Sequence, residues 1–377
     1  MKTPFIFLTV FDYPTRFAHA VHGLHMARAF SAREDLDFHF VVNMAKSGTL
    51  TGIPYMQLFG SIGRWVKRAR LRRLLLMPAF FKVLLQCRTN KDSVVFINDP
   101  ALLWVVLIGK FFFRYHIVLE SHSLLPEKKR RQLQKYATAV FGVSAGICED
   151  FERTIEKSKV HLLPNAVDVA AYAHLETSAR DEVRNLLHVG KDTVLMGYVG
   201  RLAPLGEDKG IALMLEGLAQ LPARVSLLLV GGVPQEEATF REVAKKHGVE
   251  KRVHFIAHVA PDSVPRYVVA CDVLVFVPPG GTVFFEKETS PMKLYEYMAS
   301  KRPIIVSDVP TNRGVLSDTE ARFVRAGSMP DFVAAVAEVT SPMNAPVVFG
   351  RVEAAYSRVR GNSWEHRVEE IVKRART

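Results

Sequence analysis

Two cations follow one apolar run of the sequence at a spacing that suits phosphate chemistry. The run Val194–Val199 leads directly into Gly200 and Arg201, and Lys209 stands shortly after them. Gly200 permits a close turn, so Arg201 and Lys209 can reach the same strand end. A guanidinium fork binds phosphate oxygens, and a lysine ammonium neutralises a leaving phosphate. The loop indicates a diphosphate site, the alternative being a solvated pair of surface cations.

A second loop combines a helix start with two carboxylates. It follows the apolar run Val273–Val277, and in it Ser290 fits an N-cap and Pro291 the first helical position. The free amides of such a helix start bind anions. Glu288 and Glu296 flank this start, which is unusual beside an anion unless they accept hydrogen bonds from sugar hydroxyls. The alternative is one capping box and one solvated carboxylate.

These loops must be positioned by strands, and short β-branched or aromatic runs alternate with helical stretches along the whole chain. This alternation predicts βα units that wind parallel sheets. The expected strands are Phe5–Val10, Phe38–Asn43, Ser93–Asn98, His116–Ser121, Ala139–Val143, Val160–Leu163, Val194–Val199, Val225–Val230, Val253–Ile256, Val273–Val277, Pro303–Ser307 and Arg322–Val324. Two sets of six predict two Rossmann-like, doubly wound domains, residues 1–170 and 171–364, with a cleft between the carboxyl ends of their sheets.

Length and composition agree with two globular domains. The chain has 377 residues, of which 49% are apolar and 23% charged, so each domain can bury its own core. Its three cysteines stand alone in the sequence, which argues against a disulfide framework or a structural zinc site and fits a reducing cytoplasm. The apolar run 101–109 is too short to span a membrane, so no transmembrane segment is expected, and the start of the chain is interpreted as a strand and not a signal peptide.

The formal net charge of +12 is concentrated in the first half of the chain. Its densest part contains cations mixed with an aromatic side chain and no carboxylate, namely Arg64, Trp65, Lys67, Arg68, Arg70, Arg72 and Arg73. This mixture favours peripheral docking on an anionic membrane surface. A solvated basic helix and a nucleic-acid contact remain as alternatives.

Taken together, these motifs resemble the GT-B retaining glycosyltransferases of the family 4 type. The second half carries the resemblance in Gly200–Leu202, Lys209–Gly210, the spacing of Glu288 and Glu296, Ser290–Ala299 and Pro303–Asp308. The first half continues it in Asn98–Pro100, Glu120–His122, Val143–Ser144 and Pro164–Asp168. The order and spacing of these fragments make the resemblance specific, and it covers most of the chain.

The resemblance implies a role for each matching residue. Arg201 and Lys209 would hold the donor diphosphate, Glu296 the nucleotide ribose and Glu288 the donor sugar. Further donor contacts would come from Gly200 and from the helix start Ser290, Pro291, Met292 and Lys293, with His254–Ala260 beside the base. His122 would contact the transferred sugar, although a histidine at a strand end is often only a satisfied polar residue.

The resemblance also implies a mechanism that needs no metal and no cofactor, because protein cations and helix amides stabilise the leaving diphosphate. The acceptor hydroxyl would attack from the face that the diphosphate leaves, with retention of stereochemistry. The glycine-rich acceptor loop of the family is not evident, and Arg16, His19 and His22 stand at its place. A C-terminal helix within residues 365–377 would cross back to the first domain, as in GT-B proteins.

The leading hypothesis is therefore a cytoplasmic glycosyltransferase that uses a nucleotide-diphosphate sugar. Its acceptor would be a lipid-linked or cell-envelope glycan of polysaccharide biosynthesis, met at the inner membrane face by a peripherally bound protein. One alternative is a GT-B-type nucleotide-sugar epimerase or hydrolase. Another is a non-catalytic basic protein that binds nucleic acid, against which the phosphate site and the cationic segment fall in different halves of the chain.

Overall fold

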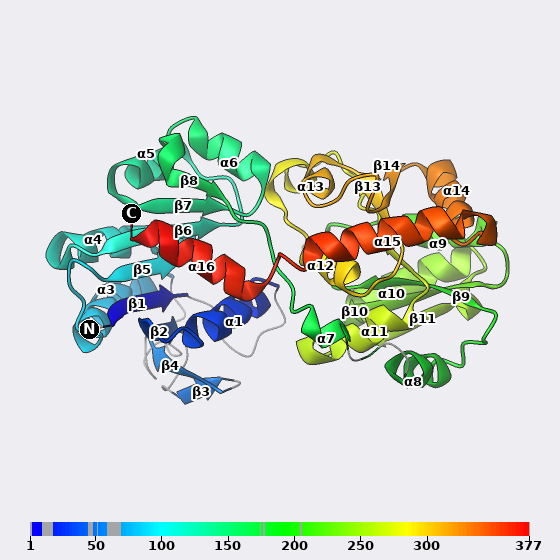
Figure 1. The fold of residues 1–377 in the computed structure, drawn as a ribbon, viewed down its shortest axis with the longest axis horizontal. Coiled ribbons are helices and arrows are strands. Elements are labelled where there is room, and N and C mark those ends of the chain that lie inside the picture. The colour runs from blue at the N-terminus through cyan, green and yellow to red at the C-terminus, as the bar shows by residue number, and fades with distance from the viewer. Residues whose placement is uncertain are drawn as a thin grey trace. The chain divides into compact units, whose positions relative to one another are not determined.

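The computed structural model describes residues 2–9, 18–43, 48–50, 52–58, 69–173, 175, 178–203 and 206–376, with the side chains of residues 18, 19 and 69–74 left out. The chain forms two compact units, drawn in Figure 1. Unit 1 is Met1–Pro164 together with Trp364–Thr377, and unit 2 is Asn165–Ser363. The boundaries fall after residues 164 and 363, where the sequence predicts them after 170 and 364.

Unit 1 is built on an eight-stranded sheet. Its order is β3-β4-β2-β1-β5-β6-β7-β8, and every described pairing is parallel except that of β3 with β4. The strands are β1 (Thr3–Leu8), β2 (Leu36–Val42), β3 (Gly48–Leu50), β4 (Ile53–Gln57), β5 (Val94–Ile97), β6 (His116–Ser121), β7 (Ala139–Gly142) and β8 (Val160–Leu162). The sequence pattern does not predict β3 and β4, because these short strands at one side of the sheet contain Pro54 and mostly half-buried or exposed residues and therefore show no apolar run.

The helices of unit 1 cover this sheet. They are α1 (Ala18–Ser31), α3 (Ala69–Gln86), α4 (Leu103–Phe113), α5 (Glu127–Tyr136), α6 (Ala145–Glu152) and α16 (Trp364–Ala375). Helix α16, red in Figure 1, packs beside the blue α1 and against β6. Its buried residues Trp364, Val368 and Ile371 recur at helical spacing, which gives the helix one apolar face. The segment after unit 2 thus completes the core of unit 1.

Unit 2 contains a six-stranded, all-parallel sheet of order β11-β10-β9-β12-β13-β14. The strands are β9 (Val194–Val199), β10 (Val225–Gly232), β11 (Val253–Ala257), β12 (Val273–Phe276), β13 (Ile304–Asp308) and β14 (Arg322–Arg325), and each one is predicted from the sequence. In chain order within this unit, the arrangement is 3-2-1-4-5-6, the doubly wound order of the Rossmann fold. The direction of winding reverses between β9 and β12, so the loops after these two strands border the position where such sheets bind ligands.

Nine helices surround the described part of the second sheet. They are α7 (Ala170–Ala173), α8 (Ser178–Leu186), α9 (Ile211–Gln220), α10 (Pro234–Lys246), α11 (Val264–Ala270), α12 (Met292–Ala299), α13 (Pro310–Arg313), α14 (Met329–Val339) and α15 (Ala345–Val359). In the parts of the chain covered by the structure, no single helix has the length and apolar character to cross a membrane. One pair bent by 73°, Met329–Val339 with Pro342–Val359, meets those two criteria jointly.

Candidate functional site

The loop after β9 returns to the sheet and brings Lys209 beside the strand ends. The Lys209 amide donates to the carbonyl of Leu202 over 3.2 Å, which folds the loop back on itself. Gly210 follows with φ of 91°, and a β-carbon there would lie 2.0 Å from the carbonyl oxygen of Val277. Only glycine fits this close, left-handed turn. The extra length of the loop between Arg201 and Lys209 therefore does not keep the lysine away from the strand ends.

Lys209 is buried against two aromatic rings. Its Nζ lies 4.2 Å from the ring centre of Phe284 and 4.3 Å from that of Phe285. Burial lowers the pKa of this ammonium to about 8, since Glu207 and Asp208 only partly offset the loss of water. The Asp208 carboxylate is already used, because it accepts hydrogen bonds from the first amides of α9. A further negative charge beside Lys209 would therefore stabilise its ammonium form.

A second lysine, Lys293, comes from the first turn of α12 and is half-buried. Its Nζ donates to the hydroxyl of Tyr198 over 2.8 Å, and that hydroxyl donates to the carbonyl of Arg201 over 2.7 Å. The ammonium packs against Gly200, where a β-carbon would come within 3.1 Å of Nζ. Burial, together with repulsion from Lys209, lowers the pKa of Lys293 to about 7, although Glu296 acts in the opposite direction.

Lys209 and Lys293 bring two cations to the reversal point of the sheet. Among the described residues, neither Lys209 nor Lys293 forms an ion pair with a carboxylate. Two desolvated ammonium groups that repel each other are stabilised by an anion placed between them. Lys293 is predicted among the donor contacts through the main-chain amides of the Ser-Pro-Met-Lys helix start, and the contribution of its side chain is not predicted.

Arg201 is held by a carboxylate. Its guanidinium donates to both oxygens of Glu236 on α10, and the shortest distance is 2.6 Å. Burial alone would raise the pKa of Glu236, but Arg201 and the amides of Val233 and Leu202 together lower it. The role predicted for Arg201 at the diphosphate remains a prediction. In the structure its fork is oriented by Glu236, a residue that carries no local sequence signal.

The start of α12 differs from the prediction by one residue. The helix begins at Met292, Pro291 occupies the N-cap position, and no side chain in the described residues caps it. The expectation that Ser290 is the N-cap is wrong, because its hydroxyl instead accepts a hydrogen bond from the Asn165 amide over 3.2 Å. The Asn165 side chain also donates to the Ser290 carbonyl. An uncapped helix start keeps its first amides available to an anion.

The two predicted carboxylates lie in different environments. Glu296 lies in the second turn of α12, where burial raises its pKa to about 7 and Lys293 opposes the rise. Glu288 ends the short π-helical turn Phe284–Glu288 and is half-buried. A carboxyl group poised near neutral pH accepts a hydroxyl hydrogen bond in its ionised form and donates one when protonated. The assignment of Glu296 to a ribose and of Glu288 to a sugar stays a prediction.

Unit 1 contains a separate buried cluster around Glu120 at the end of β6. One carboxylate oxygen lies 3.2 Å from Nε2 of His22 and 2.8 Å from Nε2 of His122. The other accepts a 2.5 Å ion pair from Arg367 of α16. Burial alone would raise the pKa of Glu120, but Arg367 and the two histidines lower it well below its ordinary value. The structure thus gives the predicted residue His122 a buried carboxylate that fixes its ring.

Sequence analysis missed the contribution of Arg367 to this cluster. His22, Glu120 and His122 offer ligand atoms within 4.8 Å of one another, a grouping that could hold a metal ion. The guanidinium of Arg367 already supplies positive charge to the same carboxylate and also donates to the carbonyls of Leu163 and Pro164. The contact joins residues more than two hundred positions apart, so no local pattern could reveal it.

Several predicted residues lie outside the described residues. These are Arg16, Arg64, Trp65, Lys67 and Arg68, together with the side chains of His19, Arg70, Arg72 and Arg73. The acceptor assignment of Arg16 and His19 and the basic segment therefore remain predictions. His22, the third acceptor candidate, is buried with 1% exposure and contacts Glu120, His122 and Trp364.

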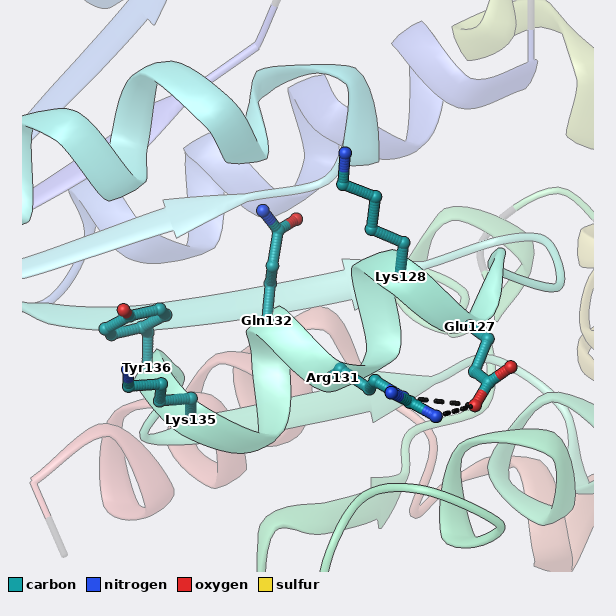
Figure 2. Close-up of a pocket in the computed structure, with 6 residues that line it drawn as sticks. All are labelled: Glu127, Lys128, Arg131, Gln132, Lys135 and Tyr136. Carbon is teal, nitrogen blue, oxygen red and sulfur yellow. Dashed lines mark hydrogen bonds and ion pairs between the residues drawn. The ribbon is translucent and has the colours of Figure 1, made fainter.

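A surface hollow in unit 1 lies along the outer side of α5, shown in Figure 2. It is lined by Glu127, Lys128, Arg131, Gln132, Lys135 and Tyr136. Its single carboxylate, Glu127, is used in a 2.6 Å ion pair with Arg131. The hollow contains none of the predicted site residues, so the two buried clusters are the better candidates for chemistry.

Comparisons with known proteins agree with this geometry. Residues 193–341 match the family of group 1 glycosyl transferases, and that segment includes both lysines and Glu296. A Bacillus subtilis protein named as a glycosyltransferase of teichuronic acid biosynthesis is 22% identical over 190 residues, which cover 50% of this chain and 45% of the relative. The matched segment thus spans about half the length of the curated relatives.

Solved structures match over nearly the whole chain. The Anabaena HepE protein in complex with UDP and glucose superposes with a TM-score of 0.75 at 16% identity, covering 98% of both chains. A glycosyltransferase from Rickettsia africae gives a TM-score of 0.81 at 12% identity, covering 99% of this chain and 98% of that one. The chain has the GT-B fold, as predicted from the sequence. Its second unit contains the segment that matches the group 1 glycosyl transferases.

Proposed function

We propose that this protein is a glycosyltransferase that takes a sugar from a nucleotide-diphosphate sugar. The observation that carries the proposal is a pair of lysines at the reversal point of a Rossmann sheet, buried Lys209 and half-buried Lys293. The pKa of each is lowered and neither has a carboxylate partner among the described residues, so an anion bound there would stabilise both ammonium groups. The match of this segment to group 1 glycosyl transferases and the likeness to a protein that binds UDP and glucose support it.

In the proposed reaction, the bond between the anomeric carbon and the diphosphate oxygen breaks, and the electron pair stays on the diphosphate. Lys209, Lys293 and the first amides of α12 stabilise the charge that develops there. The acceptor oxygen bonds to the same face of that carbon, and its proton passes to a phosphate oxygen. The sugar therefore keeps its anomeric configuration, as expected for the family 4 type, and no metal ion or other cofactor is required.

The other site residues receive roles that follow the family resemblance. Arg201, oriented by Glu236, adds a third cation at the diphosphate, while Glu296 takes the ribose and Glu288 the transferred sugar. His122 contacts the transferred sugar near the reacting carbon, with its ring held by Glu120. These assignments rest on the resemblance together with the geometry within each unit.

The proposed acceptor is a lipid-linked or cell-envelope glycan, met at the cytoplasmic face of the membrane. The concentration of positive charge in the first half of the chain supports an anionic surface as the second partner. A relative named for teichuronic acid biosynthesis supports a place in polysaccharide biosynthesis. No nucleic-acid partner is proposed.

The test is isothermal titration of the purified chain with UDP-, GDP-, ADP- and dTDP-sugars in the presence of EDTA. The sugar nucleotides of one base should bind the wild type, and their affinity for Lys209→Ala should be at least tenfold lower. The matched control is Lys245→Ala, which removes an exposed lysine from α10 of the same unit and should change nothing. If no nucleotide sugar bound, or if both variants lost affinity equally, the proposed donor site would be wrong.

Product analysis separates transfer from the alternative reactions. The enzyme that binds a donor is incubated with it in the presence and absence of a membrane glycan fraction. Transfer requires the acceptor and leaves the anomeric configuration unchanged in the product. Release of free sugar, or an epimerised donor, without any acceptor would instead identify a hydrolase or an epimerase.

A further inference from the structure

Unit 1 exposes an aromatic surface where α3 and α4 end. Phe111 is 81% exposed, Phe112 63% and Leu85 66%. The ring of Phe112 packs edge-on against Phe81 with centroids 5.3 Å apart, and Phe111 packs against Phe112 at 5.2 Å. The rings of Phe81, Phe111 and Phe112 are therefore contiguous, and Leu85 lies one helical turn after Phe81 on α3. These four side chains are here called the aromatic patch. Contiguous exposed aromatic side chains mark interaction sites.

The charges around the aromatic patch have a single sign. Lys82, Arg88 and Arg114 are exposed on the same two helix ends. The sequence contains no aspartate or glutamate from residue 38 to residue 91, and none from residue 100 to residue 119. The first carboxylate after α3 is Asp92, in the turn before β5. The patch therefore suits an anionic partner and repels a second copy of itself.

An arginine in the left-handed backbone conformation follows the end of each of these two helices. Arg88 has φ of 50° and Arg114 has φ of 63°, the left-handed region in which glycine or asparagine usually ends a helix. A charged, β-carbon-bearing residue at this position carries a conformational cost. The residue in this conformation is an arginine after both α3 and α4. His188 and Lys301 adopt the same conformation after helices of unit 2, so the case for Arg88 and Arg114 rests on their exposure and charge beside the aromatic patch.

We propose that the aromatic patch docks unit 1 on the surface of an anionic lipid bilayer. Phe111, Phe112 and Leu85 enter the boundary between headgroups and acyl chains, while Arg88 and Arg114 contact lipid phosphates. The inference rests on the proposed function in so far as that function places the acceptor at a membrane. This contact is distinct from the one predicted for the basic segment 64–73, because it is made by aromatic side chains at the other end of α3.

The bilayer is favoured over other anionic partners by the apolar side chains involved. Leu85 and the half-exposed Met77 have no aromatic face on which a base could stack, although they can enter a lipid boundary. The patch also lies where α4 leads into the amino end of β6, whereas Glu120 and His122 lie at its carboxyl end. Substitutions in the patch should therefore leave the Glu120 cluster intact.

The test measures co-sedimentation of the full chain with vesicles of phosphatidylcholine alone and of phosphatidylcholine with 30% phosphatidylglycerol (a ~0.3 fraction chosen to resemble an anionic leaflet). Two double variants are compared. Phe111→Ser with Phe112→Ser removes the inserting rings. Arg88→Gly with Arg114→Gly removes the charges and suits the left-handed backbone, so it should not weaken the fold. The matched control is Phe349→Ser, a phenylalanine 66% exposed on α15 of unit 2.

The wild type should bind the anionic vesicles more tightly than the neutral ones. The phenylalanine variant should lose at least tenfold in partition coefficient (about 0.8 kcal/mol per buried CH₂ group makes this a lower bound). The arginine variant should lose about thirtyfold, since each cation near the surface contributes roughly fivefold. The control Phe349→Ser should bind as the wild type does.

Two results would overturn the proposal. The first is that the wild type binds the anionic vesicles no more tightly than the phenylalanine variant does. The other is a change of the sedimentation mass from dimer to monomer in the phenylalanine variant without any effect on vesicles, which would assign the patch to a second copy of the chain. Soluble nucleotide-sugar binding, measured on the same variants, tests the donor site separately, so failure of the two proposals can be told apart.

Discussion

Binding of a sugar diphosphate should draw protons from solution, because the two lysines that face it are partly neutral in the free protein. The pKa of Lys293 is lowered to about 7 and that of Lys209 to about 8. At pH 7.5 about three-quarters of Lys293 and about one quarter of Lys209 are then unprotonated. A bound diphosphate raises both pKa values by supplying the missing negative charge, so the complex should take up about one proton at this pH.

The sign of the pH dependence follows directly. Protonated lysines favour the complex, so the lysines alone make the affinity fall as the pH rises, by about tenfold per unit near pH 7.5. Glu296 opposes this effect, since its pKa of about 7 leaves about a quarter of it protonated at pH 7.5, and ionisation on binding a ribose would release that proton. Below about pH 7 the release from Glu296 exceeds the uptake by the lysines, so the affinity of the wild type should be highest near neutral pH, whereas that of Glu296→Gln should only fall as the pH rises.

Titration calorimetry in two buffers with different ionisation enthalpies measures this uptake. The ligand is a nucleotide-diphosphate sugar, whose diphosphate diester does not titrate in this range. Lys293→Met should reduce the uptake to about a quarter of a proton or less, whereas Lys209→Arg, which stays charged, should reduce it by only about a quarter. Equal heats in both buffers between pH 6.5 and 8.5 would refute the lysine site, because an anion bound elsewhere would leave these pKa values unchanged.

Three further substitutions test the scaffold of the two sites. Arg367→Met should lower the free energy of unfolding of unit 1 by about 3 kcal/mol, because it leaves the buried carboxylate of Glu120 without its counter-ion, and urea denaturation should show the loss in one of two transitions. Gly210→Ala should cost at least about 2 kcal/mol, since its β-carbon meets a carbonyl oxygen, and a thermal melt that matched the wild type would contradict that contact. Glu236→Ala should lower the free energy of unfolding by about 1 kcal/mol and leave the Arg201 guanidinium without its carboxylate partner. Donor binding should then be weaker, while its pH dependence should stay as in the wild type.

The sequence was sufficient to predict the architecture because its strands are buried. The strands of unit 2 are short apolar runs between helical stretches, and all six are found at the expected positions. Strand β4 is different, since it lies next to the edge strand β3, is mostly half-buried or exposed and has no continuous apolar run. Strands near a sheet edge are only partly buried, so the periodicity that identifies a strand is weakest there.

The candidate site could be predicted in part. The cations around Gly200 and the α12 start stand within short segments, so local motifs indicate them. The contact of Lys293 with Tyr198 depends instead on how two strands and a helix meet, and no spacing in the sequence encodes it. The wrong N-cap assignment of Ser290 has the same origin, because its hydroxyl is taken by Asn165, a residue far away in the chain.

The return of α16 to unit 1 sets the order in which the two units can be completed during synthesis. Unit 2 is one continuous segment, so it can fold as soon as Ser363 has left the ribosome. Unit 1 begins first but needs Trp364–Thr377, and until then Glu120 stands in its strand without the guanidinium that neutralises it. Unit 1 is therefore completed only after unit 2 has been synthesised, because α1 and β6 lack the packing of α16 until then.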